Sequence, residues 1–206
     1  MKLHIIKNNG KRVGLNVSLC PIRTCSPGVR RACAAFRLRK DGTRSKRRYC
    51  YACKFLKRAN VVKAWSDNTR LILQDPVAFF AGIREYLRAK QPRFFRLWVA
   101  GDYPTPQTIK MVYSLARQCP NTKILSFTKR WLDGWCFPKT PQNMTVVYSA
   151  WSTLAKPPKG HHVAWCDDGR ETRIPADALE CPGRCDQCGM CWSLNEIKKD
   201  VYFHVH

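Results

Sequence analysis

Acidic residues are scarce in this sequence, and long apolar runs are missing. The 206 residues include 37 Lys and Arg but only 14 Asp and Glu, so the formal net charge is +23. No apolar run approaches the roughly 20 residues that a helix needs to cross a bilayer. The opening residues, Met1 to His4, lead into no apolar segment of the kind that directs secretion. We therefore expect a cytoplasmic protein that neither spans a membrane nor is exported.

Common catalytic patterns are missing as well. The sequence contains no glycine-rich loop of the kind that cradles phosphates and no pair of carboxylates at an informative spacing. It also places no Ser or Cys nucleophile beside an identifiable base. The cysteines and the basic residues are therefore the main indications of function.

Groups that can form a core are abundant. Hydrophobic residues make up 45% of the chain and include 7 Trp, 7 Tyr and 9 Phe. Burial of such side chains offsets the conformational entropy that folding costs, which argues against disorder. A chain of this length fits one large domain, or one domain with a small appendage.

The positive charge is concentrated in the first third of the chain. Residues 1–63 contain eighteen Lys or Arg and one acid, Asp41, whereas residues 161–206 contain five basic and eight acidic residues. A basic segment of this density repels itself unless a polyanion is near, and the phosphate backbone of DNA or RNA is the usual one. The alternatives are a solvated surface, an anionic membrane or an acidic partner protein. The candidate phosphate-binding residues are Arg30, Arg31, Arg37, Arg39, Lys46, Arg47, Arg48, Lys54, Lys57 and Arg58.

Four cysteines lie close together near the C-terminus. They fall within eleven residues and are Cys181, Cys185, Cys188 and Cys191. Zinc usually collects two separated Cys-x-x-Cys pairs, whereas tight runs of this kind wrap iron–sulfur clusters, in which successive thiolates reach different irons. We therefore favour an iron–sulfur cluster, of the four-iron, four-sulfur type, and keep zinc as the alternative.

The other cysteines are spread along the chain. Without an export signal, the twelve cysteines are expected to be reduced rather than to form disulfides, and the clustered ones are expected to bind metal. The pair Cys50-x-x-Cys53 can be a metal-binding pair, a redox pair or two buried thiols. With Cys20 and Cys25, it can complete the C-terminal cluster or hold a second one. Cys33 fits no tight motif, and three isolated cysteines are expected to be small buried hydrophobes: Cys119, Cys136 and Cys166.

The order of predicted elements indicates an α/β protein. Asp75 and Pro76 begin a helix that Gln91-Pro92 ends, and Thr105-Pro106 begins a second helix. Short apolar runs predict strands at 94–100, 123–128 and 145–150. Because strands that alternate with helices form parallel sheets, we predict a partial barrel-like or open parallel sheet with helices. A Cys-rich basic N-terminal region and a C-terminal metal-cluster loop flank this sheet.

Local patterns divide the chain into three segments. In residues 1–66 we predict a hairpin between Leu3 to Lys7 and Val13 to Leu19, an irregular segment from Cys20 to Cys53, and a basic amphipathic helix from Ala52 to Trp65. Residues 67–170 form the α/β core. Residues 171–206 form a cluster-binding segment that packs on the same domain.

Polar residues lie where three predicted strands end. They are Asp102, Lys129 and Ser149. Because the carboxyl ends of parallel strands meet on one face, we expect these residues to form a polar rim, and they are the catalytic candidates if the protein is an enzyme. In the alternative interpretation, Asp102 caps the following helix and Lys129 is solvated.

Several short motifs occur in an order that points to a known family. The ordered set Cys20-Pro21, Cys25, Cys50-Tyr51-Ala52, Gly101-Asp102-Tyr103, Thr128-Lys129 and Cys188-x-x-Cys191 resembles the phage gene-product-88 family over most of the chain. That family looks like a degenerate relative of radical S-adenosylmethionine barrels, found in phages and mobile elements. The resemblance implies an α/β fold and a place in the host cytoplasm if a phage encodes the chain. It also implies metal binding by Cys20, Cys25 and Cys50, and a polar rim that contains Asp102 and Lys129.

The chain departs from the barrel enzymes in two ways. It is short for an eight-stranded barrel. The three-cysteine spacing of those enzymes occurs only at Cys181 to Cys188, which is not its usual place, so we treat that match as accidental.

Three functions fit these observations. The first is a nucleic-acid-binding protein whose cluster is structural and in which Tyr49, Tyr51 and Trp65 stack on bases. The second is a radical or redox enzyme that acts on a nucleic acid or a nucleotide. The third is an interaction module that grips a host or phage protein.

Overall fold

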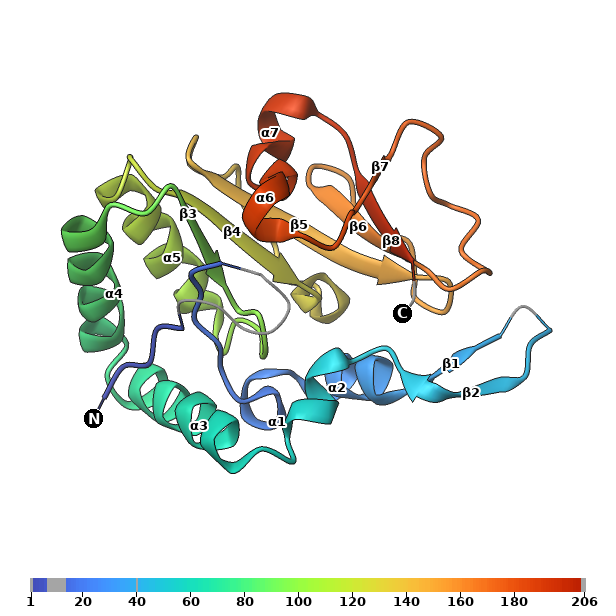
Figure 1. Cartoon of the computed structure of the whole chain (residues 1–206), viewed down its shortest axis with the longest axis horizontal. Coiled ribbons are helices and arrows are strands. Elements are labelled where there is room, and N and C mark those ends of the chain that lie inside the picture. Colours follow the sequence, from blue (N-terminus) through green and yellow to red (C-terminus); the bar gives the residue numbers. More distant parts are fainter. Residues whose placement is uncertain (1, 7–13, 40, 205–206) are drawn as a thin grey trace.

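A parallel sheet forms the centre of the computed structural model, which describes residues 2–6, 14–39 and 41–204 (Figure 1). Within these residues the sheet has six strands in the order β3-β4-β5-β6-β8-β7 and curves into a half-barrel. The strands are β3 (Phe94–Leu97), β4 (Lys123–Thr128), β5 (Met144–Trp151), β6 (His162–Asp167), β7 (Leu179–Glu180) and β8 (Val201–His204). The predicted α/β class with a parallel sheet is confirmed.

Three of these strands match the predicted ones. β4 and β5 lie where expected, and β3 covers the first four residues of the strand predicted at 94–100. Trp98 follows β3 with a left-handed backbone, at a φ of 54°. β5 is buried along its whole length, since both faces of the sheet are covered, as in other parallel sheets.

Three long helices pack on the outer face of the sheet. They are α3 (Ala59–Gln74), α4 (Pro76–Lys90) and α5 (Pro106–Gln118) (Figure 1). The predicted start of α4 is confirmed, because the Asp75 carboxylate accepts a hydrogen bond from the Ala78 N–H at 2.8 Å. The predicted end is confirmed at Gln91, which has a left-handed backbone. Among the described helices, none is both long and apolar enough to cross a membrane.

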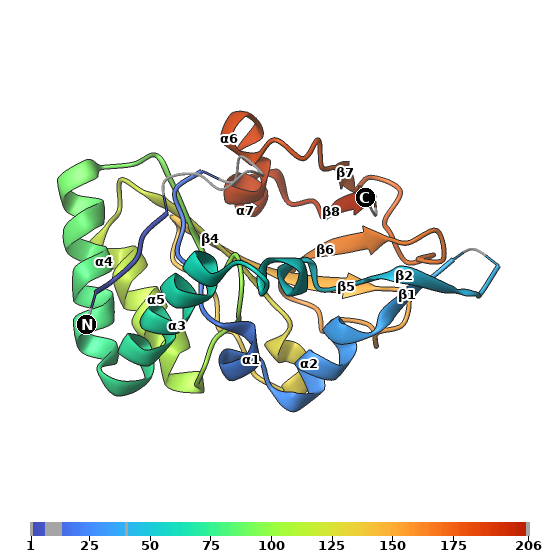
Figure 2. The same cartoon turned by 60° about the horizontal axis from the view of Figure 1, so that its bottom comes forward.

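The C-terminal segment covers the concave face of the sheet. It contains α6 (Cys185–Cys188), the 3-10 turn η3 (Met190–Ser193) and α7 (Leu194–Ile197). Figure 2 shows α6 and α7 on the opposite side of the sheet from α3 and α5. The Trp192 indole donates a hydrogen bond to the Phe95 carbonyl at 3.0 Å, and its ring packs against Leu125 and Val147. These contacts hold the C-terminal cysteines against the sheet.

An extended N-terminal segment runs beside β3. The Val17 N–H donates to the Arg96 carbonyl at 3.1 Å, and the Leu19 N–H donates to the Ala100 carbonyl at 2.9 Å. The pairing is parallel, so residues 15–19 prolong the parallel sheet at its β3 edge. The predicted hairpin is represented by one antiparallel bridge between Ile6 and Asn16, and its predicted turn at residues 8–10 lies outside the described residues.

Two N-terminal predictions were wrong. The segment from Cys20 to Cys53 is structured, and its elements are α1 (Pro21–Thr24), α2 (Pro27–Ala34), the antiparallel pair β1 (Phe36–Leu38) and β2 (Arg44–Arg48), and the 3-10 turn η1 (Tyr51–Phe55). The basic helix predicted at 52–65 begins only at Ala59, because Arg58 is extended. Lys54, Lys57 and Arg58 therefore precede α3 and do not lie on one helical face. The β1–β2 hairpin protrudes from the body (Figure 1).

Candidate metal centre

Four N-terminal cysteines come together at the carboxyl edge of the sheet. Because residues 15–19 run parallel to β3, the chain leaves this segment at the edge where β3, β4 and β5 end. Helix α2 and turn η1 then bring two distant cysteines side by side, and the Cys50 N–H donates to the Cys33 carbonyl at 2.8 Å. We call the following group the N-terminal cysteine set: Cys25, Cys33, Cys50 and Cys53.

The thiols of this set are close enough to perturb one another. Burial raises the pKa of the Cys25 thiol far above its usual range, and Asp102 and Cys33 raise it further. Burial also raises the pKa of Cys33 to about 12, with a contribution from Cys50. The pKa of Cys53 rises to about 11 through burial and through its charge interaction and hydrogen bond with Cys50. These three thiols therefore keep their protons at neutral pH unless a cation binds among them.

Lys129 supplies positive charge beside these thiols. Lys129 lies two residues after Phe127, which belongs to β4. Side chains two residues apart along a strand point to the same face, so both side chains lie on the concave side. Burial lowers the pKa of Lys129, but Cys33 and Asp102, together with other thiols of the set, outweigh burial and raise the pKa. The ammonium also lies 5.9 Å from the centroid of the Trp151 ring. Lys129 can therefore stabilise thiolates or an anion bound among them.

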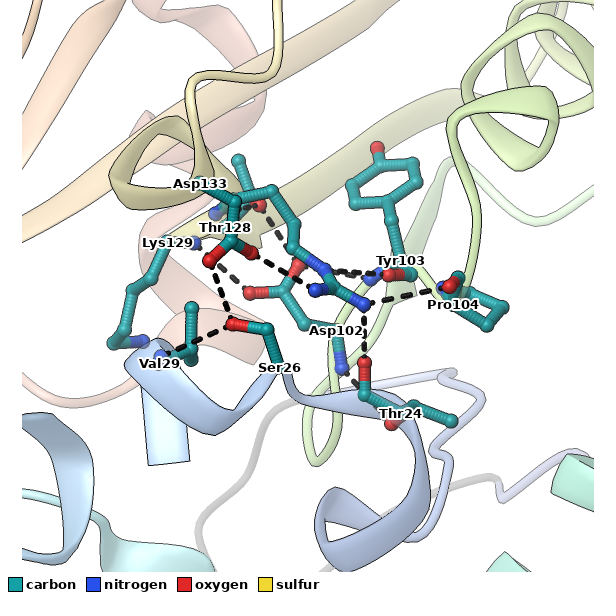
Figure 3. Close-up of polar contacts among 10 residues, drawn as sticks. Thr24, Ser26, Val29, Asp102, Tyr103, Pro104, Thr128, Lys129 and Asp133 are labelled. Carbon is teal, nitrogen blue, oxygen red and sulfur yellow. Dashed lines mark hydrogen bonds and ion pairs between the residues drawn. The ribbon is translucent and has the colours of Figure 1, made fainter. Parts of the chain in front are cut away.

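Asp102 fastens the ends of two strands together (Figure 3). Its carboxylate accepts hydrogen bonds from the Thr128 hydroxyl at 2.7 Å and from the Tyr103 and Lys129 N–H groups at 2.9 Å each. Burial raises the pKa of this carboxyl group, against the opposing effect of Lys129. The alternative role as a helix cap is not what the structure shows, because Thr105 stands at the start of α5. Asp102 is a positioning residue at the rim.

Arg130 ties the cysteine-rich chain to the same edge. Its guanidinium donates to the carbonyl oxygens of Tyr103 and Thr24 at 2.7 Å each and pairs with the Asp133 carboxylate at 2.9 Å. Asp133 in turn accepts a hydrogen bond from the Ser26 hydroxyl at 2.7 Å, and Ser26 caps the N-terminus of α2 (Figure 3). These buried polar contacts fix the start of the helix that carries Cys33.

Gly101 allows the cysteine-rich chain to lie against the sheet edge. Its φ is +80°, and a Cβ atom there would lie 2.6 Å from the Thr24 hydroxyl oxygen and 2.9 Å from the Leu19 carbonyl oxygen. Both the backbone conformation and the lack of space therefore require glycine. The close approach places the chain before Cys25 directly on the loop that follows β3.

An aromatic pair closes the side of the set next to β5. Tyr49 stacks on Trp151 with ring centroids 4.5 Å apart, and its hydroxyl donates to the Asp168 carboxylate at 2.5 Å. The prediction that Tyr49 and Trp65 stack on bases was wrong, because both side chains are buried in the protein. Sequence spacing could not reveal this burial, since their partners lie far along the chain.

The C-terminal cysteines form a second group, here called the C-terminal cysteine set, which consists of Cys181, Cys185, Cys188 and Cys191. Three of them pack in the core cluster that contains Trp192 on the concave face. Burial raises the pKa of Cys191 to about 12, and the other three thiols of the set add to this effect. The predicted gathering of these four cysteines is therefore present in the structure.

Tyr51 and Arg96 lie between the two sets. Burial raises the pKa of Tyr51. Charges on Arg96 and Lys129, and on one cysteine of each set, Cys50 and Cys185, also affect this pKa. The N-terminal cysteine set lies on and beside α2 and η1, whereas the C-terminal cysteine set lies on and beside α6 and η3. The thiols therefore form two groups held by different elements.

The donor chemistry suits thiolate-bound metal. Among the described side chains, no group of three or more His, Cys, Asp or Glu residues has the arrangement needed to hold a single metal ion. Each set nevertheless gathers four soft thiol donors in a shielded place, and iron–sulfur clusters use four Cys ligands that bind different irons. The residues present therefore fit a polynuclear cluster.

Comparison with known protein families identifies the family of this chain. A family model described as gene product 88 matches residues 4–194. The chain belongs to the gene product 88 family. Comparisons with curated proteins and with solved structures gave no match. The gene product 88 match confirms the resemblance and includes every cysteine of both sets.

The predicted ligands take different places in this gene product 88 protein. Cys25 and Cys50 belong to the N-terminal cysteine set, whereas Cys20 is buried against Ala52, Trp65 and Ala100. Cys53 was considered only as part of the Cys50-x-x-Cys53 pair, and the resemblance matched Cys33 and Cys53 less securely. The Cys50-x-x-Cys53 spacing indicated one of them, but no local signal indicated Cys33.

The structure also shows where the remaining candidate residues lie. Ser149 is buried in β5 on the same face as Val147 and Trp151, which lie on the concave side. Cys119 and Cys166 are buried as expected, whereas the prediction of burial for Cys136 was wrong, since Cys136 is exposed. Cys136 lies in the loop after the 3-10 turn η2 (Arg130–Asp133).

The predicted phosphate-binding residues lie on or beside α2, the β1–β2 hairpin and η1. Arg44 and Arg48 lie over the Phe36 ring, at 3.8 Å and 4.1 Å from its centroid, and Arg48 also donates to the Ala34 carbonyl. These contacts stiffen the hairpin. The side chains that remain exposed include those of Arg31, Arg39, Lys46, Arg47, Lys54, Lys57 and Arg58. In the described part of this gene product 88 protein, none of them forms an ion pair with a carboxylate.

Proposed function

We propose that this gene product 88 protein is an iron–sulfur protein that binds DNA or RNA through its N-terminal basic region. The observation that carries the proposal is the position of the β1–β2 hairpin, which protrudes from the body and joins α2 to η1. α2 carries Cys33, η1 carries Cys53, and Cys50 directly precedes η1. A cluster bound by these thiols would fix both ends of the cationic hairpin, which would otherwise repel itself.

The arrangement of thiols supports iron–sulfur over zinc. Zinc usually collects two separated Cys-x-x-Cys pairs, whereas the C-terminal cysteine set comes from one run of eleven residues. A four-iron cluster accepts thiolates that bind different irons, which suits the four C-terminal thiols that line one small pocket. We propose one cluster in each cysteine set, mainly with a structural role.

The charge distribution supports nucleic acid as the partner. Lys46 and Arg47 on β2 are exposed, and the neighbouring Arg44 and Arg48 are held over Phe36, so four cations lie along one short strand. Phosphate oxygens accept hydrogen bonds from such side chains without regard to sequence. Asp41 is the only acid in the hairpin, and its carboxylate accepts hydrogen bonds from Thr43.

Metal analysis of protein purified without oxygen tests the cluster. We expect a brown protein that absorbs at about 400 nm, with about eight irons per chain if both sets hold a four-iron cluster. Exposure to oxygen should bleach the colour. A colourless protein that contains zinc, or no metal, would contradict the proposed iron–sulfur function.

One observation favours an enzymatic role as a second candidate. The N-terminal cysteine set follows the first parallel segment and lies at the carboxyl edge with Lys129 and Asp102, where parallel α/β sheets gather their reactive groups. A radical enzyme of this type would bind S-adenosylmethionine at the cluster. The reduced, oxygen-free protein should then cleave S-adenosylmethionine to deoxyadenosine and methionine, and a protein that neither binds nor cleaves it would remove this candidate.

A further inference from the structure

A large cavity lies beside β5, outside both cysteine sets. The connection from β3 to β4 contains α5, but the chain between β4 and β5 and between β5 and β6 contains no α-helix. The loops at residues 131–142 and 155–162 instead line an open cavity of about 1300 Å³. Pockets for small molecules typically measure about 300–1000 Å³, so this cavity can hold a ligand of that class with space to spare.

Aromatic rings form much of the cavity wall. The rings belong to Trp131, Trp135, Phe137, Tyr148 and His161. The Tyr148 and His161 rings lie 4.8 Å apart, and the Phe137 and Tyr148 rings lie 5.8 Å apart. Trp131, Phe137 and Tyr148 are buried and support the wall, whereas Trp135 and His161 are half-buried. Because every nucleobase has an aromatic face, these two rings can stack on any base.

One polar group in the wall matches the edge of a base. His161 Nε2 lies 2.6 Å from the Phe137 carbonyl oxygen, which can only accept, so Nε2 carries the proton. Burial lowers the pKa of His161, so the ring is neutral at pH 7 and its Nδ1 can accept a hydrogen bond. The wall therefore contains a ring nitrogen that can accept a hydrogen bond from a base.

The charges around the cavity favour an anion. Lys139, Lys156 and Lys159 line it, are exposed, and take part in none of the described ion pairs. The carboxylate in the wall, Glu196, is paired with Lys123 at 2.7 Å. Free lysines beside a neutralised carboxylate leave a net positive rim, which suits a phosphate group.

We propose that this cavity binds a nucleotide, with the base among the aromatic rings and the phosphate on Lys139, Lys156 and Lys159. The inference does not depend on the cysteine sets or on the basic hairpin, because it rests on other residues. A free nucleotide and an unpaired nucleotide of a nucleic-acid strand offer the same chemistry. The volume has room for more than one nucleotide, so a short single strand also fits.

Titration of the full chain with AMP, GMP, CMP and UMP tests the proposal through quenching of tryptophan fluorescence. We expect at least one of them to bind with a Kd below about 1 mM. The double variant Lys156→Glu/Lys159→Glu should bind at least about tenfold more weakly, since two attractive charges become repulsive.

Matched controls separate this site from the proposed function. Lys90→Glu/Lys110→Glu changes two exposed lysines on α4 and α5 by the same charge and should bind the nucleotide as the unmodified chain does. Lys46→Glu/Arg47→Glu should also keep nucleotide affinity, whatever it does to oligonucleotide binding.

A tetranucleotide that binds more tightly than the best mononucleotide would identify a strand as the natural ligand, and equal or weaker binding would identify a free nucleotide. Binding of none of the four mononucleotides, or equal binding by the Lys156→Glu/Lys159→Glu variant, would overturn the inference.

Discussion

The double variant Lys46→Glu/Arg47→Glu is expected to lose about 100-fold in affinity for a DNA or RNA oligonucleotide at about 150 mM salt. Both side chains are exposed on β2, so their replacement removes two phosphate contacts and adds repulsion without disturbing the core. Arg44 and Arg48 are unsuitable for this test, because they pack on Phe36 and support the hairpin itself.

The salt dependence of binding gives a second measure of the same contacts. Each phosphate contact contributes about 0.9 to the slope of the logarithm of affinity against the logarithm of salt concentration for duplex DNA, so the slope of the variant should be smaller by about 2. Lys90→Glu/Lys110→Glu, which lowers the net charge equally at a distant surface, serves as the control. If both variants lose affinity equally, net charge rather than the hairpin governs binding, and the proposed interface is wrong.

Replacement of one cysteine in each set is expected to halve the iron content. Cys33→Ala should remove the N-terminal cluster and leave about four irons per chain, and Cys188→Ala should do the same for the C-terminal cluster. The loss should be close to complete for each site, because a missing thiolate leaves one iron without its protein ligand. Iron analysis of oxygen-free protein, together with the absorption spectrum, measures both effects.

Cys136→Ser is the matched control for these substitutions. Cys136 is exposed and belongs to neither set, so its removal should leave iron content and colour unchanged.

The Cys33→Ala variant should also lower DNA or RNA affinity, since α2 and η1 would no longer be joined at the base of the hairpin. Unchanged iron in Cys33→Ala and reduced iron in Cys188→Ala would limit the protein to one C-terminal cluster.

The positions of the predicted elements show where local patterns were sufficient. The Asp75-Pro76 start and the Gln91-Pro92 end of α4 were predicted correctly, because capping and proline geometry depend on a few adjacent residues. The segment from Cys20 to Cys53 was predicted as irregular, although it contains two helices and a hairpin. Its helices are short and its strands carry many charges, so neither shows the apolar periodicity from which elements are predicted.

The candidate site was predicted only in part. Asp102 and Lys129 were placed at one edge correctly, because parallel strands bring their carboxyl ends together. The membership of Cys33 in the N-terminal cysteine set was not predictable from spacing, since sixteen residues separate Cys33 from Cys50. The roles of Tyr49 and Trp65 were predicted incorrectly for the same reason, as burial depends on partners distant in sequence.

The sequence by itself determined the α/β class, the ends of α4, the close spacing of Cys181 to Cys191 and the basic character of the first third of the chain. Each of these follows from residues that are neighbours along the chain. Only the tertiary structure decided that residues 15–19 join the sheet in parallel, that two cysteine sets form on its concave side, and that an aromatic cavity lies beside β5. These features depend on long-range packing and strand pairing. Because residues 15–19 pair in parallel with the edge of β3, the cysteine-rich chain that follows them begins at the carboxyl ends of the strands.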